Sequence, residues 1–343
     1  MFNNQYGVPQ KVVDRLLKDL DEKDIKLQER ESVTANWIQK YKELESQLAS
    51  RTDDIAKKTK AFLDDGKLED AEKLFSEALS GALEKAANNA FSLAQIKVLQ
   101  LNYPEAKNYY QQAVQLAPEN ALYLNELGTH LYTLGAYDQA EPLYKRSLSI
   151  WEQTLGKDHP DVAKSLNNLA ALYYTQGSYE QAKPFYIRSL AIWKKALGTE
   201  HPNVASGLNN LALLYKTEGK YSQAESLYQE SLAIRKKALG EDHPDVATSL
   251  NNLAGLYYTQ SKFAEAEPLY QRSLDIRVKA LGKEHPDVAT SLNNLAMLYK
   301  KLGKNSQAKP LYQRSLAILE KSLGEEHPST KAVRNNLQKL LKD

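Results

Sequence analysis

One short motif recurs every 42 residues, and this period constrains the fold more than any other feature of the chain. The copies are His159-Pro-Asp-Val, His201-Pro-Asn-Val, His243-Pro-Asp-Val, His285-Pro-Asp-Val and His327-Pro-Ser-Thr. The first four are followed by a close relative of SLNNLAALYYTQG and then of YEQAKPFYIRSLAIWKKALG. A period of this length predicts a stack of similar structural units that bury a continuous core between neighbours.

Each 42-residue unit predicts two helices. Apolar residues with helical spacing form one stripe on the first helix: Val162, Leu166, Leu169 and Tyr173. Gly177 should end that helix, as Gly does at the equivalent turns except at Ser261. The second helix should run from near Tyr179 to Leu197, and Pro202 should lie at the start of the next helix.

Alanines at the expected helix–helix contact extend the array toward the N-terminus. Ala140, Ala182, Ala224, Ala266 and Ala308 keep the 42-residue step, and Ala106 and Ala71 precede them at shorter steps. We therefore expect two divergent repeats in 51–118, five 42-residue repeats in 119–328 and a capping helix in 329–343. The fold class predicted is an all-α, superhelical solenoid of helix–turn–helix repeats.

Residues 1–50 form a separate N-terminal helical segment in this interpretation. Its apolar residues predict two amphipathic stretches: Val13, Leu16, Leu17 and Leu20, then Trp37, Tyr41, Leu44 and Leu48. The segment could cap the first repeat or form a short coiled coil between chains. The run Glu31-Ser-Val-Thr interrupts the heptads that a coiled coil requires.

Composition excludes several function classes. The net charge is +2 and cysteine is absent, so neither a nucleic-acid-binding protein nor a thiolate metal site is indicated. No nucleotide-binding or hydrolase motif occurs, and no apolar run is long enough to span a membrane. The sequence predicts a cytoplasmic, non-enzymatic protein without cofactors. The five His-Pro motifs favour helix capping over metal binding, because equivalent loops of stacked repeats lie too far apart to share an ion.

The words SLNNLAALY, YxQAEPLYxRSL and LGxxHPDVA resemble the 42-residue tetratricopeptide repeats of kinesin light chains, over about residues 119–342. The resemblance implies a right-handed superhelix whose first helices line a concave groove that captures peptide segments of partner proteins. Binding to a motor heavy chain is not implied, since residues 9–50 are short and interrupted.

Helical geometry predicts which residues line that groove. Opposite the apolar stripe lie Lys164 and two rows of asparagines, Asn168, Asn210, Asn252 and Asn294 beside Asn167, Asn209, Asn251 and Asn293, followed by Tyr174, Lys216, Tyr258 and Lys300. Asparagine is unfavourable in an exposed helix, so its repetition suggests an amide in use. The amides could bind a peptide backbone or could join adjacent repeats.

The tyrosines at positions 173, 179 and 186 and their equivalents are interpreted as core. The groove lysines, with few acids near them, suggest an acidic peptide partner. The function predicted is that of a protein-binding scaffold or adaptor. The alternative is a regulatory subunit that controls a separately encoded effector enzyme, for example a protease.

Overall fold

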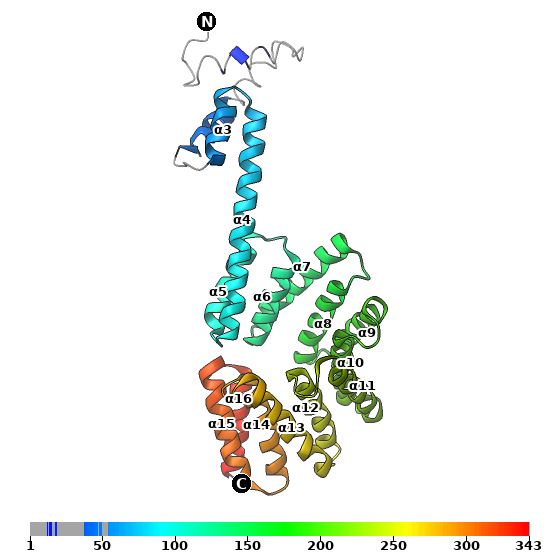
Figure 1. Ribbon diagram of the computed structural model, residues 1–343. Helices are drawn as coiled ribbons and strands as arrows, with labels where there is room; N and C mark the ends of the chain where they lie inside the picture. The colour runs from blue at the N-terminus through cyan, green and yellow to red at the C-terminus, as the bar shows by residue number, and fades with distance from the viewer. Residues whose placement is uncertain are drawn as a thin grey trace. The chain divides into compact units, whose positions relative to one another are not determined.

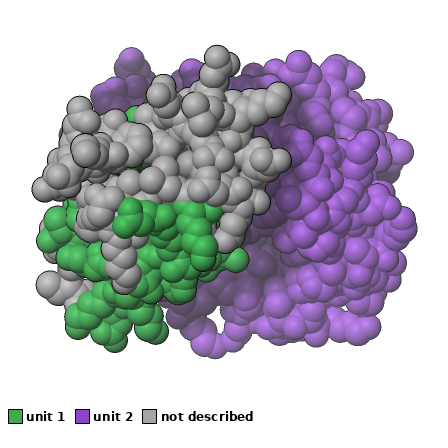
Figure 2. Space-filling model, turned by 90° about the horizontal axis from the view of Figure 1, so that it is seen from above, with its two compact units in different colours: residues 1–86 green, residues 87–343 purple. Residues whose placement is uncertain are grey.

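The computed structural model describes residues 54–342, together with residues 12, 14, 15, 18, 38–46, 48 and 49. This part of the chain consists of helices joined by short turns and contains no strand, which confirms the predicted all-α solenoid of paired helices (Figure 1). Two compact units are distinguished, Met1–Ala86 and Ala87–Asp343, coloured separately in Figure 2.

Unit 1 contains α3 (Asp54–Asp64) and the first part of α4 (Leu68–Leu99). Tyr41, Leu44 and Leu48 are buried in one cluster with residues of these two helices, Ala56, Leu63, Ala71 and Phe75. Val13, Leu16, Leu17, Leu20 and Trp37 lie outside the described residues.

Helix α4 continues without a turn from unit 1 into unit 2. The two divergent repeats expected in 51–118 therefore share this helix, α3 pairing in sequence with its first part and α5 (Tyr103–Leu116) following its last. The repeat limits given above remain predictions.

The rest of unit 2 alternates two kinds of helix. The first helices are α6 (Ala121–Thr133), α8 (Pro160–Thr175), α10 (Pro202–Thr217), α12 (Pro244–Thr259), α14 (Pro286–Lys301) and α16 (Pro328–Lys342). The second helices are α7 (Tyr137–Leu155), α9 (Tyr179–Leu197), α11 (Tyr221–Leu239), α13 (Phe263–Leu281) and α15 (Asn305–Leu323).

The local signals act as the sequence predicted. His159 caps α8 by accepting the backbone N–H of Asp161 at Nδ1, at 3.2 Å, and Pro160 is the first helical residue. The other four motif histidines accept the equivalent N–H at 3.1 Å. Gly177 follows α8 with a φ of 79°, a conformation that glycine adopts without steric cost.

The core lies between the paired helices. Ala182 and its equivalents are fully buried, as are Tyr186 and its equivalents to within a few per cent. The prediction for Tyr179 is wrong, because its side chain is 37% exposed and lies against the ring of Tyr174 at 5.2 Å. Tyr173 is only partly buried and donates its hydroxyl to Glu141 at 3.0 Å. Tyr179 is the first residue of α9, so its side chain lies at the edge of the core.

Successive first helices contact one another, whereas no contact of similar extent joins successive second helices of the described array. Elements on the inside of a curved stack must lie closer together than those outside. The first helices, which carry the predicted groove residues, therefore form the inner, concave layer of unit 2 (Figure 1).

Candidate binding face

The two predicted asparagine rows are joined by hydrogen bonds between adjacent first helices. In every repeat the second asparagine donates its Nδ2 to the Oδ1 of the first asparagine in the preceding repeat. These bonds are Asn168 to Asn125 at 3.2 Å, Asn210 to Asn167 at 2.9 Å, Asn252 to Asn209 at 3.1 Å, Asn294 to Asn251 at 3.0 Å and Asn336 to Asn293 at 3.1 Å.

Bonds within each repeat extend the network. Asn209 donates to the neighbouring Asn210 at 3.3 Å, Asn251 to Asn252 at 3.5 Å and Asn293 to Asn294 at 3.2 Å. The amides from Asn336 to Asn167 thus form a single chain in which every bond between repeats is donated to the preceding repeat. Asn125, Asn209 and Asn251 are buried, whereas the second asparagines are half-buried.

Both asparagine rows therefore take part in contacts between adjacent repeats, one of the two roles that the sequence left open. An asparagine amide has two N–H donors and an oxygen with two lone pairs. The chain uses one donor of Asn210, Asn252 and Asn294, so each half-buried side chain retains an N–H that can bind a ligand. Peptide binding by these residues stays a prediction.

Tyrosine and threonine make a second row of contacts on the same face. The hydroxyl of Tyr132 bonds to that of Thr175 at 2.7 Å, and Tyr174 bonds in the same way to Thr217 at 2.8 Å. In the next repeat Lys216 replaces the tyrosine, although the repeat after it still has a threonine, Thr259. Tyr258 follows, but Lys301 replaces the threonine in the repeat after it.

Lys216 differs electrostatically from the residues that surround it. Burial lowers the pKa of its ammonium, and among the described residues it has no carboxylate partner. Its Nζ lies 3.5 Å from where a side chain at Gly255 would begin, so glycine leaves room for it. The inner face thus holds a partly desolvated positive charge that the fold does not neutralise.

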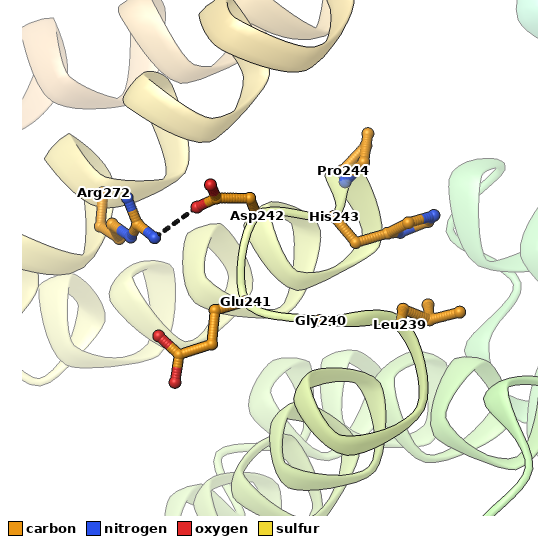
Figure 3. A pocket seen from close by; sticks show the side chains of 7 residues that line it. All are labelled: Leu239, Gly240, Glu241, Asp242, His243, Pro244 and Arg272. Atoms are coloured by element: carbon orange, nitrogen blue, oxygen red, sulfur yellow. Dashed lines mark hydrogen bonds and ion pairs between the residues drawn. The ribbon is translucent and has the colours of Figure 1, made fainter.

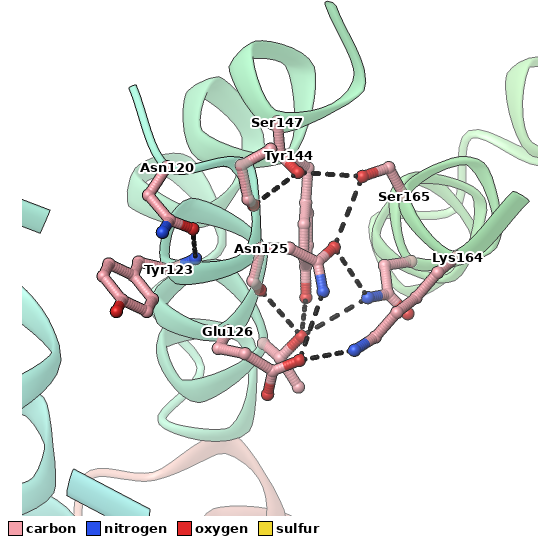
Figure 4. Close-up of polar contacts among 11 residues, drawn as sticks. Asn120, Tyr123, Asn125, Glu126, Tyr144, Ser147, Lys164 and Ser165 are labelled. Carbon is pink, nitrogen blue, oxygen red and sulfur yellow. Dashed lines mark hydrogen bonds and ion pairs between the residues drawn. The ribbon is translucent and has the colours of Figure 1, made fainter. Parts of the chain in front are cut away.

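Lys164, by contrast, is paired within the protein. Its ammonium donates to Glu126 at 2.6 Å, and the amide of Asn125 reaches the same carboxylate oxygen at 3.5 Å (Figure 4). Glu126 occupies the position that asparagine holds in later repeats and accepts from both Asn125 and Lys164. Lys300, on α14, is half-buried, as Lys216 is on α10.

Sequence reasoning missed the buried serines of the second helices. Ser147 donates to the carbonyl of Ala121 at 2.8 Å, and Ser231, Ser273 and Ser315 make the equivalent bond at 2.7 to 2.8 Å. These side chains are fully buried and join the two helices of one repeat. The recurrence of serine in the words RSL and ESL was the signal that could have identified them.

Surface depressions are found elsewhere on the described residues. One is lined by the His243-Pro244 loop, Leu239 to Asp242 and Arg272, where Arg272 forms an ion pair with Asp242 at 2.7 Å (Figure 3). No group of three or more potential metal-binding side chains occurs in the described part of the chain. Within that same part, no helix is both long and apolar enough to cross a membrane.

The fold and this face define a helical repeat protein of the solenoid class. The sequence profile of the tetratricopeptide repeat matches five overlapping segments: 118–186, 164–237, 208–279, 245–321 and 287–340. The chain belongs to the tetratricopeptide-repeat family. Members of this family generally mediate protein–protein interactions, and the family is generally non-enzymatic.

Solved structures similar to the chain include BtubC (BKLC) from P. vanneervenii, at 27% identity over 74% of this chain and 93% of that one, with a TM-score of 0.46. A putative kinesin light chain with nearly identical repeats from Podosopora anserina is 29% identical over 60% of this chain and 97% of that one, with a TM-score of 0.44. The family match confirms the tetratricopeptide repeats expected from the sequence. No curated protein matches the chain significantly.

Proposed function

We propose that the inner face of unit 2 binds extended, acidic segments of partner proteins, and that the protein acts as a scaffold or adaptor in the cytoplasm. Neither nucleic acid nor a membrane surface is the partner in this proposal. The observation that carries it is the unpaired ammonium of Lys216, half-buried among hydrogen-bonded residues of the first helices.

Lys216 is an unfavourable choice for stability alone. Tyrosine at the equivalent positions 132 and 174 bonds to the next repeat, whereas lysine gives up that bond and places a charge in a poorly hydrated site. Residues that break a structural pattern without a compensating gain in stability are expected at functional sites. A carboxylate from a bound peptide would supply the missing countercharge.

The charges around the face favour an acidic ligand. Lys300 and Lys301 both lie at the end of α14, two first helices beyond Lys216, and add positive charge there, while Glu126 is already paired with Lys164. Glu218, on the turn after α10, is held by Lys183 and Lys220. In this proposal the remaining N–H groups of Asn210, Asn252 and Asn294 donate to the carbonyls of an extended backbone.

Replacing Lys216 by tyrosine tests the proposal, because the variant should complete the tyrosine–threonine row with Thr259. We expect Lys216→Tyr to keep or raise the melting temperature. We also expect it to weaken binding to an array of acidic synthetic peptides at least about tenfold, the loss of one charge-assisted contact. Lys236→Tyr on α11 is the control, since that lysine lies on a second helix. Equal peptide binding by the parent and Lys216→Tyr would contradict the proposal.

The asparagines are tested in the same assay with the double variant Asn210→Ala and Asn252→Ala. Each substitution removes one bond between repeats, so the free energy of unfolding should fall by about 0.5–1.5 kcal/mol per site. If the amides also bind peptide, affinity should fall as well. A lower melting temperature with unchanged affinity would restrict the rows to holding repeats together.

A further inference from the structure

The last helix of unit 2 touches the beginning of the 42-residue array. The Nε2 of His327, the residue that caps α16, lies 2.8 Å from the backbone carbonyl oxygen of Thr133 at the end of α6. Pro328 packs against the turn between α6 and α7 so closely that a Cβ at Gly135 would lie 2.8 Å from the Cδ of Pro328. His327 and Thr133 are 194 positions apart in the sequence.

The charge of one further residue acts across the same number of repeats. Burial raises the pKa of Tyr103, the first residue of α5, and the negative charge of Asp287 in the first turn of α14 raises it further. In the order of helices, α14 lies five repeats beyond the pair containing α5, and α16 lies five repeats beyond α6. The contact of His327 with Thr133 thus indicates that five repeat steps complete one turn, and the effect of Asp287 on Tyr103 across the same five steps agrees with it (Figure 1).

The chemistry of His327 suits a directed contact. Its Nδ1 accepts the N–H of Ser329 at 3.1 Å, so the ring hydrogen is on Nε2 and is donated to the carbonyl of Thr133. Among the motif histidines of the described residues, His327 alone has such a partner for Nε2. His327 therefore caps α16 with one ring nitrogen and contacts the end of α6 with the other.

We propose that His327 and Pro328 form a latch with the α6–α7 turn, which holds the array as a closed ring and limits entry of a partner segment to the inner face. The latch consists of one hydrogen bond and one proline against a turn, whereas adjacent repeats share fully buried residues such as Val204 and Leu208. It is therefore the interface that can open without disrupting a repeat. The part concerning entry rests on the proposed function.

Glycine at two equivalent turns provides a matched test of the latch. Gly135 and Gly177 both have a positive φ, 74° and 79°, but only a Cβ at position 135 would meet Pro328, since nothing lies within 4 Å of position 177. Asparagine tolerates this conformation. Gly135→Asn should therefore open the latch, and Gly177→Asn should leave it closed.

The chain contains no cysteine, so spin labels can be placed cleanly at the exposed positions Gln139→Cys and Ala332→Cys. Electron paramagnetic resonance should give a short, narrow distance distribution in the parent and in Gly177→Asn. Gly135→Asn should add a population at longer distances while the helix content by circular dichroism stays unchanged. A broad distribution in the parent, or the same distribution in both variants, would overturn the latch.

Entry to the inner face is measured without any partner. A cysteine in place of the exposed Thr259 on α12 is treated with N-ethylmaleimide and with a maleimide that carries a long polyethylene glycol chain. We expect Gly135→Asn to speed the reaction of the polymer several-fold and to leave the small reagent unaffected, with no change in Gly177→Asn. Equal polymer rates would overturn control of entry. Failure of the peptide-binding proposal would leave these rates unaltered, so the two outcomes can be told apart.

Discussion

Ser261 adopts a left-handed backbone conformation, with a φ of 59°, at a turn where the neighbouring repeats have glycine. Its backbone N–H still bonds to the carbonyl of Tyr258 at 3.0 Å, so the turn keeps its shape. A side chain in this conformation brings Cβ close to a backbone oxygen, which glycine avoids.

Replacing this serine by glycine should therefore stabilise the protein. We expect Ser261→Gly to raise the free energy of unfolding by up to about 1 kcal/mol, because the strain is relieved and no bond is lost. The reciprocal change, Gly177→Ser, should lower it by a similar amount. Urea unfolding measures both. An unchanged midpoint for each variant would show that the backbone relaxes around the side chain.

The asparagines show how far residue-level prediction reaches. Their common helical face follows from the sequence, since each helix repeats the same angles. Their partners do not, because the bonded residues are 43 positions apart and not 42. The same offset joins Tyr132 to Thr175. This one-residue shift depends on how one first helix lies against the next, which no single helix encodes.

At the level of elements, boundaries marked by capping chemistry were predicted well. Helix α10 begins at Pro202 and α9 ends at Leu197, directly before Gly198. Helix α4 was not foreseen, because the alanine spacing suggested separate repeats around Ala71 and Ala106. No proline occurs between residues 68 and 99, and a lone glycine such as Gly81 costs a helix only about 1 kcal/mol. The helix therefore continues.

The second helices contain two buried arginines where earlier repeats have tryptophan. Arg235 is 5% exposed and donates to the carbonyl of Asp245 at 3.0 Å and to the hydroxyls of Ser249 at 2.8 Å and Ser206 at 3.0 Å. Burial lowers its pKa despite the nearby charge of Asp245. The side chain thus joins α11 to first helices on both sides.

Truncating Arg235 should be strongly destabilising. Arg235→Ala leaves a cavity and removes donors from three acceptors, of which the Ser249 hydroxyl is buried, so we expect a loss of about 2–4 kcal/mol in the free energy of unfolding. Arg272→Ala is the comparison, since Arg272 is half exposed and its ion pair with Asp242 should be worth at most about 1 kcal/mol. Similar losses for both, measured by chemical denaturation, would mean that burial does not set the contribution of these arginines.

For the whole molecule, association between chains depends on whether the apolar residues of the N-terminal segment are already buried within one chain. Tyr41, Leu44 and Leu48 are already buried against α3 and α4 of the same chain. They are then not free to form the apolar seam of a coiled coil with another chain, and the interrupted heptads point the same way.

We therefore expect the full-length chain to be monomeric. Light scattering at micromolar concentration should give the mass of one chain, 38.7 kDa. A stable dimer that becomes a monomer when residues 1–50 are removed would show instead that this segment joins two chains. Dimerisation that persists after the deletion would place the interface on the repeats.

Tandem copies of nearly identical coding sequence readily gain or lose whole units by unequal recombination. In an open solenoid such an event changes only the length of the protein. Here His327 meets Thr133 because five repeats separate α6 from α16. A gene with one unit more or fewer would place the last helix past or short of that turn. The copy number of the central repeats is then under selection in its own right, and relatives that retain the latch residues should retain the same number of repeats.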